Sequence, residues 1–167
     1  INGSIMKIKK SSVFGVFGAL YLCFFLVFTF LAFQPQTVEA NTNLILEIPK
    51  ISLTSPIRAL EITDENTLVS PERIAGVYHA NQNHDFIIGH STTIFQNLNK
   101  LSVGDTFRFG DQTYQIKTRK IQQKSNINMS KLLTKKSTPT ITLMTCHGEK
   151  ISGHDYTERL ILTAELI

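Results

Sequence analysis

The chain lacks the features that mark several common classes of protein. Its 167 residues include only two cysteines, Cys23 and Cys146, which excludes a scaffold held together by many disulfides. The formal net charge is only +4, and no basic cluster is interleaved with aromatic residues, so the composition does not indicate nucleic-acid binding. The sequence has no internal repeat and no low-complexity tract. The length of the chain is sufficient for one domain of ordinary size with a short appendage.

The chain has one long hydrophobic run, which lies near its N-terminus. Residues 13–33 are uncharged and rich in Phe, Leu and Val. A helix of this length, at about 1.5 Å per residue, crosses a bilayer core of about 30 Å. Three lysines lie among residues 1–12, where Met6 is a candidate start, and no Lys or Arg follows the run until Lys50. By the positive-inside rule, we expect residues 1–12 in the cytoplasm and the chain beyond the run outside the cell.

Two interpretations of this run compete. Val38-Glu39-Ala40 has the small residues of a signal-peptidase site, but the apolar core of a secretory signal is usually only about 7–15 residues long. We therefore favour an uncleaved transmembrane signal-anchor at 13–33, a polar linker at 34–43 and an extracellular domain at 44–167.

Beyond the linker, hydrophobic residues mostly recur with the period of two that is typical of half-buried strands. The predicted strands cover 44–48, 52–57, 76–79, 86–90, 106–109, 113–117, 140–146 and 159–166. Helical signals are brief: a helix start at Ser70-Pro71, an amphipathic turn over 94–101, and one helical turn over 129–133 within the polar, basic segment 119–139. Short strands with only brief helices predict an all-β barrel or sandwich.

The predicted strand at 140–146 ends on Cys146, so its thiol is expected at the rim of the sheet. Glycines and polar residues between 147 and 155 indicate a loop, and the next strand begins at Arg159. A loop of about a dozen residues can bring Cys146 and Arg159 to the same end of a sheet. Cys23 lies inside the apolar run, where it acts as a small hydrophobe, so Cys146 is left as a lone thiol.

Two blocks of residues carry a resemblance to a known family. Thr142-Leu143-Met144-Thr145-Cys146 resembles the TLxTC signature of the sortases, with Arg159 at the position of that family's arginine. Ile87-Ile88-Gly89-His90, followed by Phe95, Leu98, Leu101 and Gly104-Asp105, resembles a second block of the same family. The resemblance covers 44–167 and implies an eight-stranded sortase-type β-barrel with short helices.

The resemblance also implies a function, that of a membrane-anchored cysteine transpeptidase. Such an enzyme cleaves an LPxTG-like sorting signal between Thr and Gly through a thioester, and transfers the surface protein to an amine of a peptidoglycan precursor or a pilin. The lack of a second hydrophobic run at the C-terminal end resembles class A or class D–E more than the pilin-polymerising class, which has a C-terminal anchor. The brief connection from Cys146 to Arg159 resembles the housekeeping enzymes more than class B, which has an additional helix there. We expect substrate specificity to lie in segment 119–139 and in the wall near Leu143.

The residue roles follow from what this reaction needs: a thiolate nucleophile, a proton donor for the leaving amine and a group that stabilises the oxyanion. The resemblance implies Cys146 as the nucleophile, His90 as the acid and base, and Arg159 as the group that holds the oxyanion or the substrate backbone. Thr145 is a candidate to support the same oxyanion through its hydroxyl or its backbone N–H.

Each role has a rival interpretation. His147 adjoins Cys146, but neighbouring residues of a strand point to opposite faces, which favours His90. An arginine at the start of a strand often pairs with a surface carboxylate, and both Asp155 and Glu158 are near Arg159 in the sequence.

Metal binding is the main alternative use of the same residues. Structural zinc requires four ligands at recognisable spacing, which Cys146 with scattered histidines does not provide. Some class A sortases bind calcium through loop acids, and Asp85, Glu149 and Asp155 are acids in predicted loops, but no EF-hand spacing occurs. We therefore assign no metal and no cofactor, and leave calcium open as a modulator.

Other functions fit the sequence less well. An L,D-transpeptidase has a glycine before its cysteine, whereas Thr145 stands here, and a papain-like protease has its cysteine at the start of a helix. A non-catalytic anchored barrel that binds wall peptides has no need of the thiol at Cys146.

Overall fold

The structure is a computed structural model that describes residues 44–65, 67–153 and 155–167. The predicted cytoplasmic segment 1–12, the transmembrane anchor 13–33 and the linker 34–43 lie outside these residues. Among the helices of the described part, none is long and apolar enough to cross a membrane.

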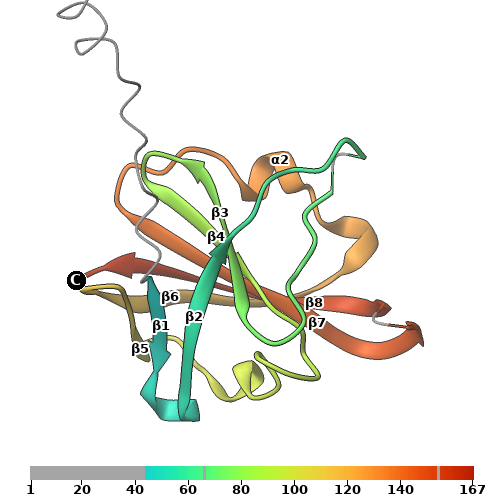
Figure 1. Ribbon diagram of the computed structural model, residues 1–167, viewed down its shortest axis with the longest axis horizontal. Helices are drawn as coiled ribbons and strands as arrows, with labels where there is room; N and C mark the ends of the chain where they lie inside the picture. The colour runs from blue at the N-terminus through green and yellow to red at the C-terminus, as the bar shows by residue number, and fades with distance from the viewer. Residues whose placement is uncertain (1–43, 66, 154) are drawn as a thin grey trace, which may run out of the picture. The chain divides into compact units, whose positions relative to one another are not determined.

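Within the described residues, eight strands close into a barrel in the order β1-β2-β3-β4-β7-β8-β6-β5 (Figure 1). The strands are β1 (Ile45–Ile48), β2 (Leu53–Ala59), β3 (Ala75–Asn81), β4 (His84–Ile88), β5 (Thr106–Phe109), β6 (Gln112–Gln123), β7 (Thr140–Ser152) and β8 (Asp155–Leu166). The helices are short: η1 (Pro49–Ile51), η2 (Leu98–Lys100), η3 (Lys124–Asn126) and α2 (Met129–Leu132). The predicted all-β class and the eight-stranded barrel are confirmed.

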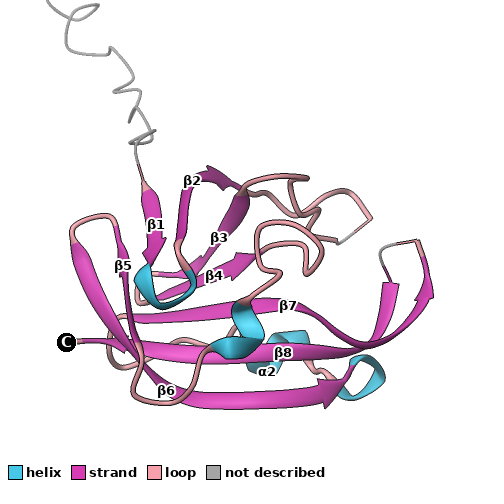
Figure 2. Cartoon of the chain, turned by 90° about the horizontal axis from the view of Figure 1, so that it is seen from below, coloured by secondary structure: helices cyan, strands magenta, loops and turns pink. Residues whose placement is uncertain are grey.

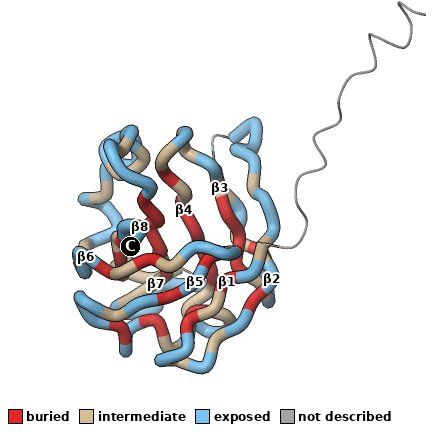
Figure 3. The backbone as a smooth tube through the Cα atoms, turned by 90° about the vertical axis from the view of Figure 1, so that its left-hand side faces the viewer, coloured by how far each residue is buried: buried red, intermediate tan, exposed pale blue. Residues whose placement is uncertain are grey.

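The barrel interior is filled by alternate residues of the strands. Figure 3 shows the buried positions along the strands and the exposed ones mainly in the connections. The interior side chains include Leu46, Ile48, Val77, Ile87, Phe107, Ile116, Ile141, Leu143, Leu160 and Leu162. Each fully buried Leu, Ile or Phe contributes roughly 1.5–3 kcal/mol, so this cluster is the main source of stability. Phe95, Leu98 and Leu101 join the same core, as the predicted amphipathic turn requires.

Strand β7 is buried on both faces at its N-terminal half. Ile141 and Leu143 point into the core, while Thr140 and Thr142 on the opposite face are also buried. This half pairs in parallel with β4, and parallel strands covered on both sides are typically β-branched and apolar. The double burial explains why the sequence of this strand lacks a clear alternation.

The connection between α2 and β7 covers part of the outer face of this region. Asn81 and Asn83 donate side-chain hydrogen bonds to the carbonyls of Leu133 and Lys136, at 3.2 and 3.3 Å. His84 contacts the carbonyl of Thr134 at 3.1 Å. Three side chains at the β3–β4 turn thus hold the connection in place.

Two expectations about local structure are wrong. Residues after Ser70-Pro71 form a bend instead of a helix; the Ser70 hydroxyl donates to the carbonyl of Pro71 and so does not cap a helix. The strand predicted at 113–117 is too short, because β6 continues to Gln123 in pairing with β8. The helical turn expected within segment 119–139 is confirmed as α2.

Candidate active site

Cys146 lies inside a long hairpin and not at the end of a strand. Strand β7 continues past it to Ser152, a tight turn follows, and β8 begins at Asp155. The expected loop of about a dozen residues is therefore wrong, because those polar residues extend the two strands beyond the barrel (Figure 2). In this ladder Cys146 is the direct cross-strand partner of Arg159.

His90 follows β4, which ends two residues earlier at Ile88. A tight turn holds it: its carbonyl accepts hydrogen bonds from the backbone N–H of Phe95 at 2.9 Å and of Thr93 at 3.3 Å. Gly89 is favoured here, because a Cβ at this position would lie 2.5 Å from Cγ2 of Ile94. A side chain at the position before His90 would therefore have to displace the packed side chains of Ile94 and Phe95.

Thr145 connects the cysteine strand to the histidine turn. Its side chain is buried, and its hydroxyl donates a hydrogen bond of 2.7 Å to the carbonyl of Gly89. This bond holds the residue before Cys146 against the residue before His90. The hydroxyl is therefore committed to a structural contact, and a role of Thr145 at the oxyanion stays a prediction.

His90, Cys146 and Arg159 line one cavity of about 460 Å³. They come from three segments: the turn after β4, strand β7 and strand β8. The other lining residues are Thr67, Leu68, Val69, Ser70, Glu72, Ile88, Gly89, Met144 and Thr145. The three residues that the sequence selected are thus brought together around one space, with an apolar wall beside them.

The cavity walls include a segment that the sequence analysis missed. Thr67 to Glu72, in the irregular β2–β3 connection, contribute five lining residues, whereas segment 119–139 contributes none. Leu143 is a fully buried core residue, so the wall near it is formed by Met144 on the opposite face of β7. An irregular segment without periodicity or motif gave no signal in the sequence.

The environment of Cys146 disfavours its thiolate. Burial raises the pKa of the thiol; the positive charge of Arg159 opposes this rise, whereas the negative charge of Asp155 adds to it. The thiol therefore needs a proton acceptor to react near neutral pH.

Arg159 pairs with a nearby carboxylate, as its rival interpretation predicts, and it also lines the cavity. Its Nη2 lies 3.4 Å from Oδ1 of Asp155, and Nη1 donates to the carbonyls of Tyr156 and Glu158 at 3.0 and 2.8 Å. Its side chain is only 14% exposed. The two interpretations of Arg159 are therefore compatible.

The other described histidines lie elsewhere. His147 Nδ1 is 3.0 Å from Oε2 of its cross-strand partner Glu158. His147 lines a neighbouring cavity of about 340 Å³ that Cys146 also borders, but His90 and Arg159 do not line that one. His79 pairs with Asp85, and His84 is buried against the α2–β7 connection. Of the histidines that the structure describes, only His90 lines a cavity together with both Cys146 and Arg159.

The three acids considered for calcium lie in strands. Asp85 in β4 is 2.6 Å from Nδ1 of His79, and Asp155 in β8 is 2.8 Å from Nζ of Lys124. Glu149 is in β7. Across the residues that the structure describes, no group of three or more His, Cys, Asp or Glu side chains is placed to hold a metal ion.

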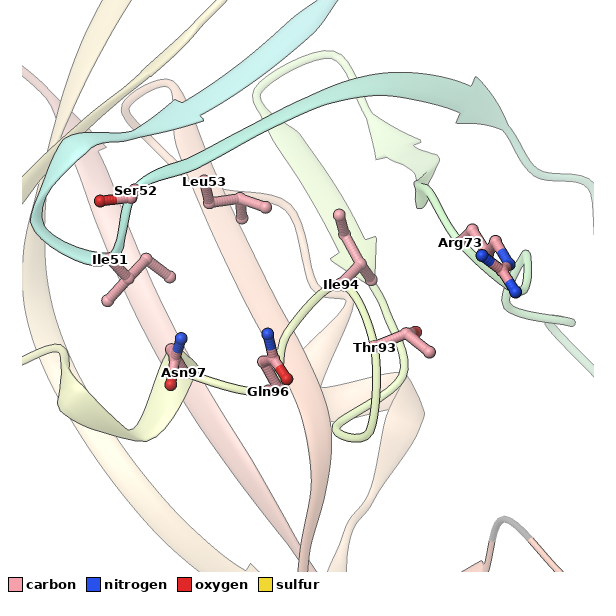
Figure 4. Close-up of a pocket in the computed structure, with 8 residues that line it drawn as sticks. All are labelled: Ile51, Ser52, Leu53, Arg73, Thr93, Ile94, Gln96 and Asn97. Atoms are coloured by element: carbon pink, nitrogen blue, oxygen red, sulfur yellow. The ribbon is translucent and has the colours of Figure 1, made fainter.

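A further cavity, of about 520 Å³, lies at the start of β2 (Figure 4). It is lined by Ile51, Ser52, Leu53, Arg73, Thr93, Ile94, Gln96 and Asn97. These residues include hydroxyls but neither a histidine nor a carboxylate to act as a base. The cavity at Cys146 is therefore the better candidate for catalysis, although it is smaller.

The architecture is therefore a closed barrel with a thiol, an imidazole and a guanidinium around one cavity, an arrangement suited to acyl transfer. The family profile described as Sortase domain matches residues 46–167. A search of curated protein sequences found no match.

Solved structures of similar fold are also sortases. Sortase C from Clostridium perfringens SM101 is 24% identical, with a TM-score of 0.55 over 74% of this chain and 68% of that one. The pilus-related sortase C of Group B Streptococcus is 23% identical, with a TM-score of 0.57 over 81% and 77%. A lid mutant of sortase A from Corynebacterium diphtheriae is 25% identical, with a TM-score of 0.56 over 80% and 74%.

The chain belongs to the sortase family, whose members are cysteine transpeptidases that anchor or polymerise surface proteins. Most of the similar structures are named sortase C. The expected resemblance to class A or class D–E is thus not confirmed.

Proposed function

We propose that this chain is a membrane-anchored transpeptidase that forms a thioester on Cys146 with an LPxTG-like sorting signal. It then passes the surface protein to an amine of a peptidoglycan precursor or a pilin. The observation that supports this proposal most directly is the shared cavity of His90, Cys146 and Arg159. The anchor at 13–33 keeps the N-terminus cytoplasmic and the catalytic domain outside the cell, in the membrane that holds the substrate's own hydrophobic tail, which raises their effective concentration.

The proposed reaction has two steps. His90 takes the proton of the Cys146 thiol, and the sulfur attacks the carbonyl carbon of the Thr–Gly bond. Arg159 stabilises the oxyanion while His90 gives its proton to the leaving glycine amine, which leaves an acyl thioester. In the second step an acceptor amine attacks the thioester carbon and loses a proton to His90, a C–N bond forms, and the C–S bond breaks to regenerate Cys146.

The lining of the cavity supports an apolar substrate segment. Leu68 and Val69 from the β2–β3 connection lie with Ile88 and Met144 around the same space. Apolar walls beside a few placed polar groups are typical of ligand sites. We infer that these side chains contact the Leu-Pro part of the sorting signal.

The hairpin supports an inference about class. In the described residues between Cys146 and Arg159, β7 and β8 are joined by a tight turn without a helix. By resemblance, class B has an additional helix at this point, so we infer a class other than B. The acceptor experiment below tests whether the chain is of the pilin class or of class A or class D–E.

Intact-mass measurement tests the proposal. The full 167-residue chain in detergent micelles, given an LPxTG peptide, is expected to gain the mass of an acyl adduct. The adduct should be absent in Cys146→Ala and reduced in His90→Gln, while His79→Gln, the matched control at an exposed histidine, should behave as wild type. Adding a glycine-type amine or a lysine-type amine should convert the adduct into an amide and identify the acceptor class. Failure of the wild-type chain to form an adduct with any of several sorting-motif peptides would contradict the proposal.

A further inference from the structure

Arg159 is held by acceptors from its own strand. Asp155 and Arg159 are four residues apart on β8 and so share one face. The Asp155 carboxylate accepts from Nη2 at 3.4 Å, and the carbonyls of Tyr156 and Glu158 accept from Nη1. A guanidinium has five N–H donors. Within the described residues, these contacts use three of the five donors, which leaves two for an oxygen of the substrate.

Asp155 is itself held in place. Nζ of Lys124, in η3, donates to both carboxylate oxygens at 2.8 and 2.9 Å, and the backbone N–H of Tyr156 donates to Oδ1 at 3.0 Å. The pKa of Asp155 lies below its usual value, first because of Lys124 and then because of Arg159. The group is therefore a fixed negative charge between two cations at neutral pH.

We propose that Asp155 is a positioning residue for Arg159, which orients the guanidinium toward the substrate bonded to Cys146. This inference rests on the proposed function. Asp155 is partly exposed, and an exposed ion pair adds little to folding stability. Its contribution is therefore expected in the geometry of Arg159, beside Cys146 in the ladder, and not in the stability of the barrel.

The carboxylate has a second, opposite effect on the site. Its negative charge raises the pKa of the Cys146 thiol. Removing the charge is thus expected to make the thiol easier to ionise and yet to slow acylation. Loss of a purely structural residue would not make the thiol easier to ionise while slowing acylation. A lower thiol pKa together with a lower acylation rate therefore identifies a positioning role.

The experiment compares Asp155→Asn with the wild-type chain in detergent micelles. The rate of thioester formation with an LPxTG peptide is expected to fall about tenfold, mainly in kcat, because a displaced orienting group costs up to about a hundredfold. The pH midpoint of alkylation of Cys146 by iodoacetamide is expected to move down. Asp155→Glu should restore part of the acylation rate, since it keeps the charge.

Two further variants serve as controls. Asp111→Asn, in the β5–β6 turn, removes an acid away from the cavity and should match wild type. Lys124→Gln keeps the contact of Asp155 with Arg159, so acylation should stay within about fivefold of wild type, as for loss of an exposed ion pair.

Three outcomes overturn the inference. The first is an acylation rate in Asp155→Asn equal to that in Asp111→Asn. The second is a loss of acylation rate in Asp155→Glu as large as that in Asp155→Asn. The third is a loss of rate in Asp155→Asn that matches a fall in its fraction of folded chain. An absence of adduct in the wild-type chain is a different result, because it overturns the proposed function instead.

Discussion

Cys146 on β7 and Arg159 on β8 are direct partners in an antiparallel ladder. Opposed residues in such a ladder have Cα atoms about 4.5–5.5 Å apart and side chains on the same face. A shift of one residue in register would turn one of the two side chains to the opposite face. The backbone pairing, and not a flexible loop, therefore fixes the guanidinium beside the thiol.

Substitutions at Arg159 should separate its charge from its shape. Arg159→Ala is expected to slow thioester formation by about 10²–10³-fold, the usual cost of removing an oxyanion donor. It should also move the alkylation midpoint of Cys146 to higher pH, because Arg159 lowers the pKa of that thiol. Arg159→Lys keeps the charge but not the planar fork, so it should restore the alkylation midpoint and only part of the acylation rate. Stopped-flow alkylation and intact mass measure the two quantities.

Arg58→Ala is the control for these variants, since Arg58 is an exposed arginine on β2 that does not line the cavity. Full acylation activity in Arg159→Ala would show that Arg159 only pairs with Asp155.

The apolar wall of the cavity predicts an effect on substrate binding. Leu68→Ala should raise the KM for an LPxTG peptide about tenfold or more, because apolar pocket contacts of this size are worth about 10–200-fold. Ile62→Ala is the matched control, since Ile62 is an exposed apolar residue of the same connection outside the cavity. Steady-state cleavage of LPxTG and APxTG peptides tests the contact, because the preference for Leu should shrink in Leu68→Ala. An unchanged preference would mean that another wall binds this residue.

The sequence predicted those parts of the site that depend on local pattern. The strand with Thr142 and Cys146 could be predicted from its continuous β-branched sequence. Such a sequence is typical of a strand that is buried on both faces. Gly89 was part of a recognised block, and the structure adds the reason, which is the close approach of Ile94. These are positions where one residue type is dictated by its neighbours in the chain.

The remaining parts depend on pairing between distant segments. The polar residues from His147 to Ser152 resemble a loop, yet they form strand, because the backbone of β8 lies opposite and satisfies their hydrogen bonds. The residues around Ser70 and Pro71 have the composition of a helix start, but nothing follows that could bury a helical face. Leu143 was expected near the substrate wall, but its side chain lies in the core. The sequence of β7 alone does not show which of its two faces is the interior of the barrel.

Gly89→Ala tests the close approach of the histidine turn to the barrel. The new Cβ would lie 2.5 Å from Ile94 Cγ2 and 2.8 Å from Phe95 Cδ2. We expect a loss of about 1–3 kcal/mol in the free energy of unfolding, as for other overpacked sites, and slower acylation because His90 moves. Adding Ile94→Ala should recover part of both, giving a coupling of at least about 0.5 kcal/mol in a double-mutant cycle by urea unfolding. Strict additivity of the two substitutions would exclude the clash as the cause.

His84 should make stability depend on pH, independently of the active site. Burial lowers the pKa of His84 below its ordinary 6.5; Lys136 adds to this effect, while Asp85 and the hydrogen bond to Thr134 oppose it. Below pH 6.5 the unfolded chain therefore binds more protons at His84 than the folded chain does. The free energy of unfolding must fall as the pH drops through this range, until the folded pKa is passed.

Thermal unfolding at pH 7.5, 6.5 and 5.5 measures this dependence. Wild type should lose more stability across the range than His84→Gln, whose amide can contact Thr134 and Thr142 but does not titrate. Asp105 and Asp155 do not interfere, because their pKa values lie below 3.8 and their effects belong to more acidic solutions. An equal slope in His84→Gln would mean that this side chain accepts a proton without leaving its buried contacts, since the Thr142 hydroxyl can turn to accept from Nε2.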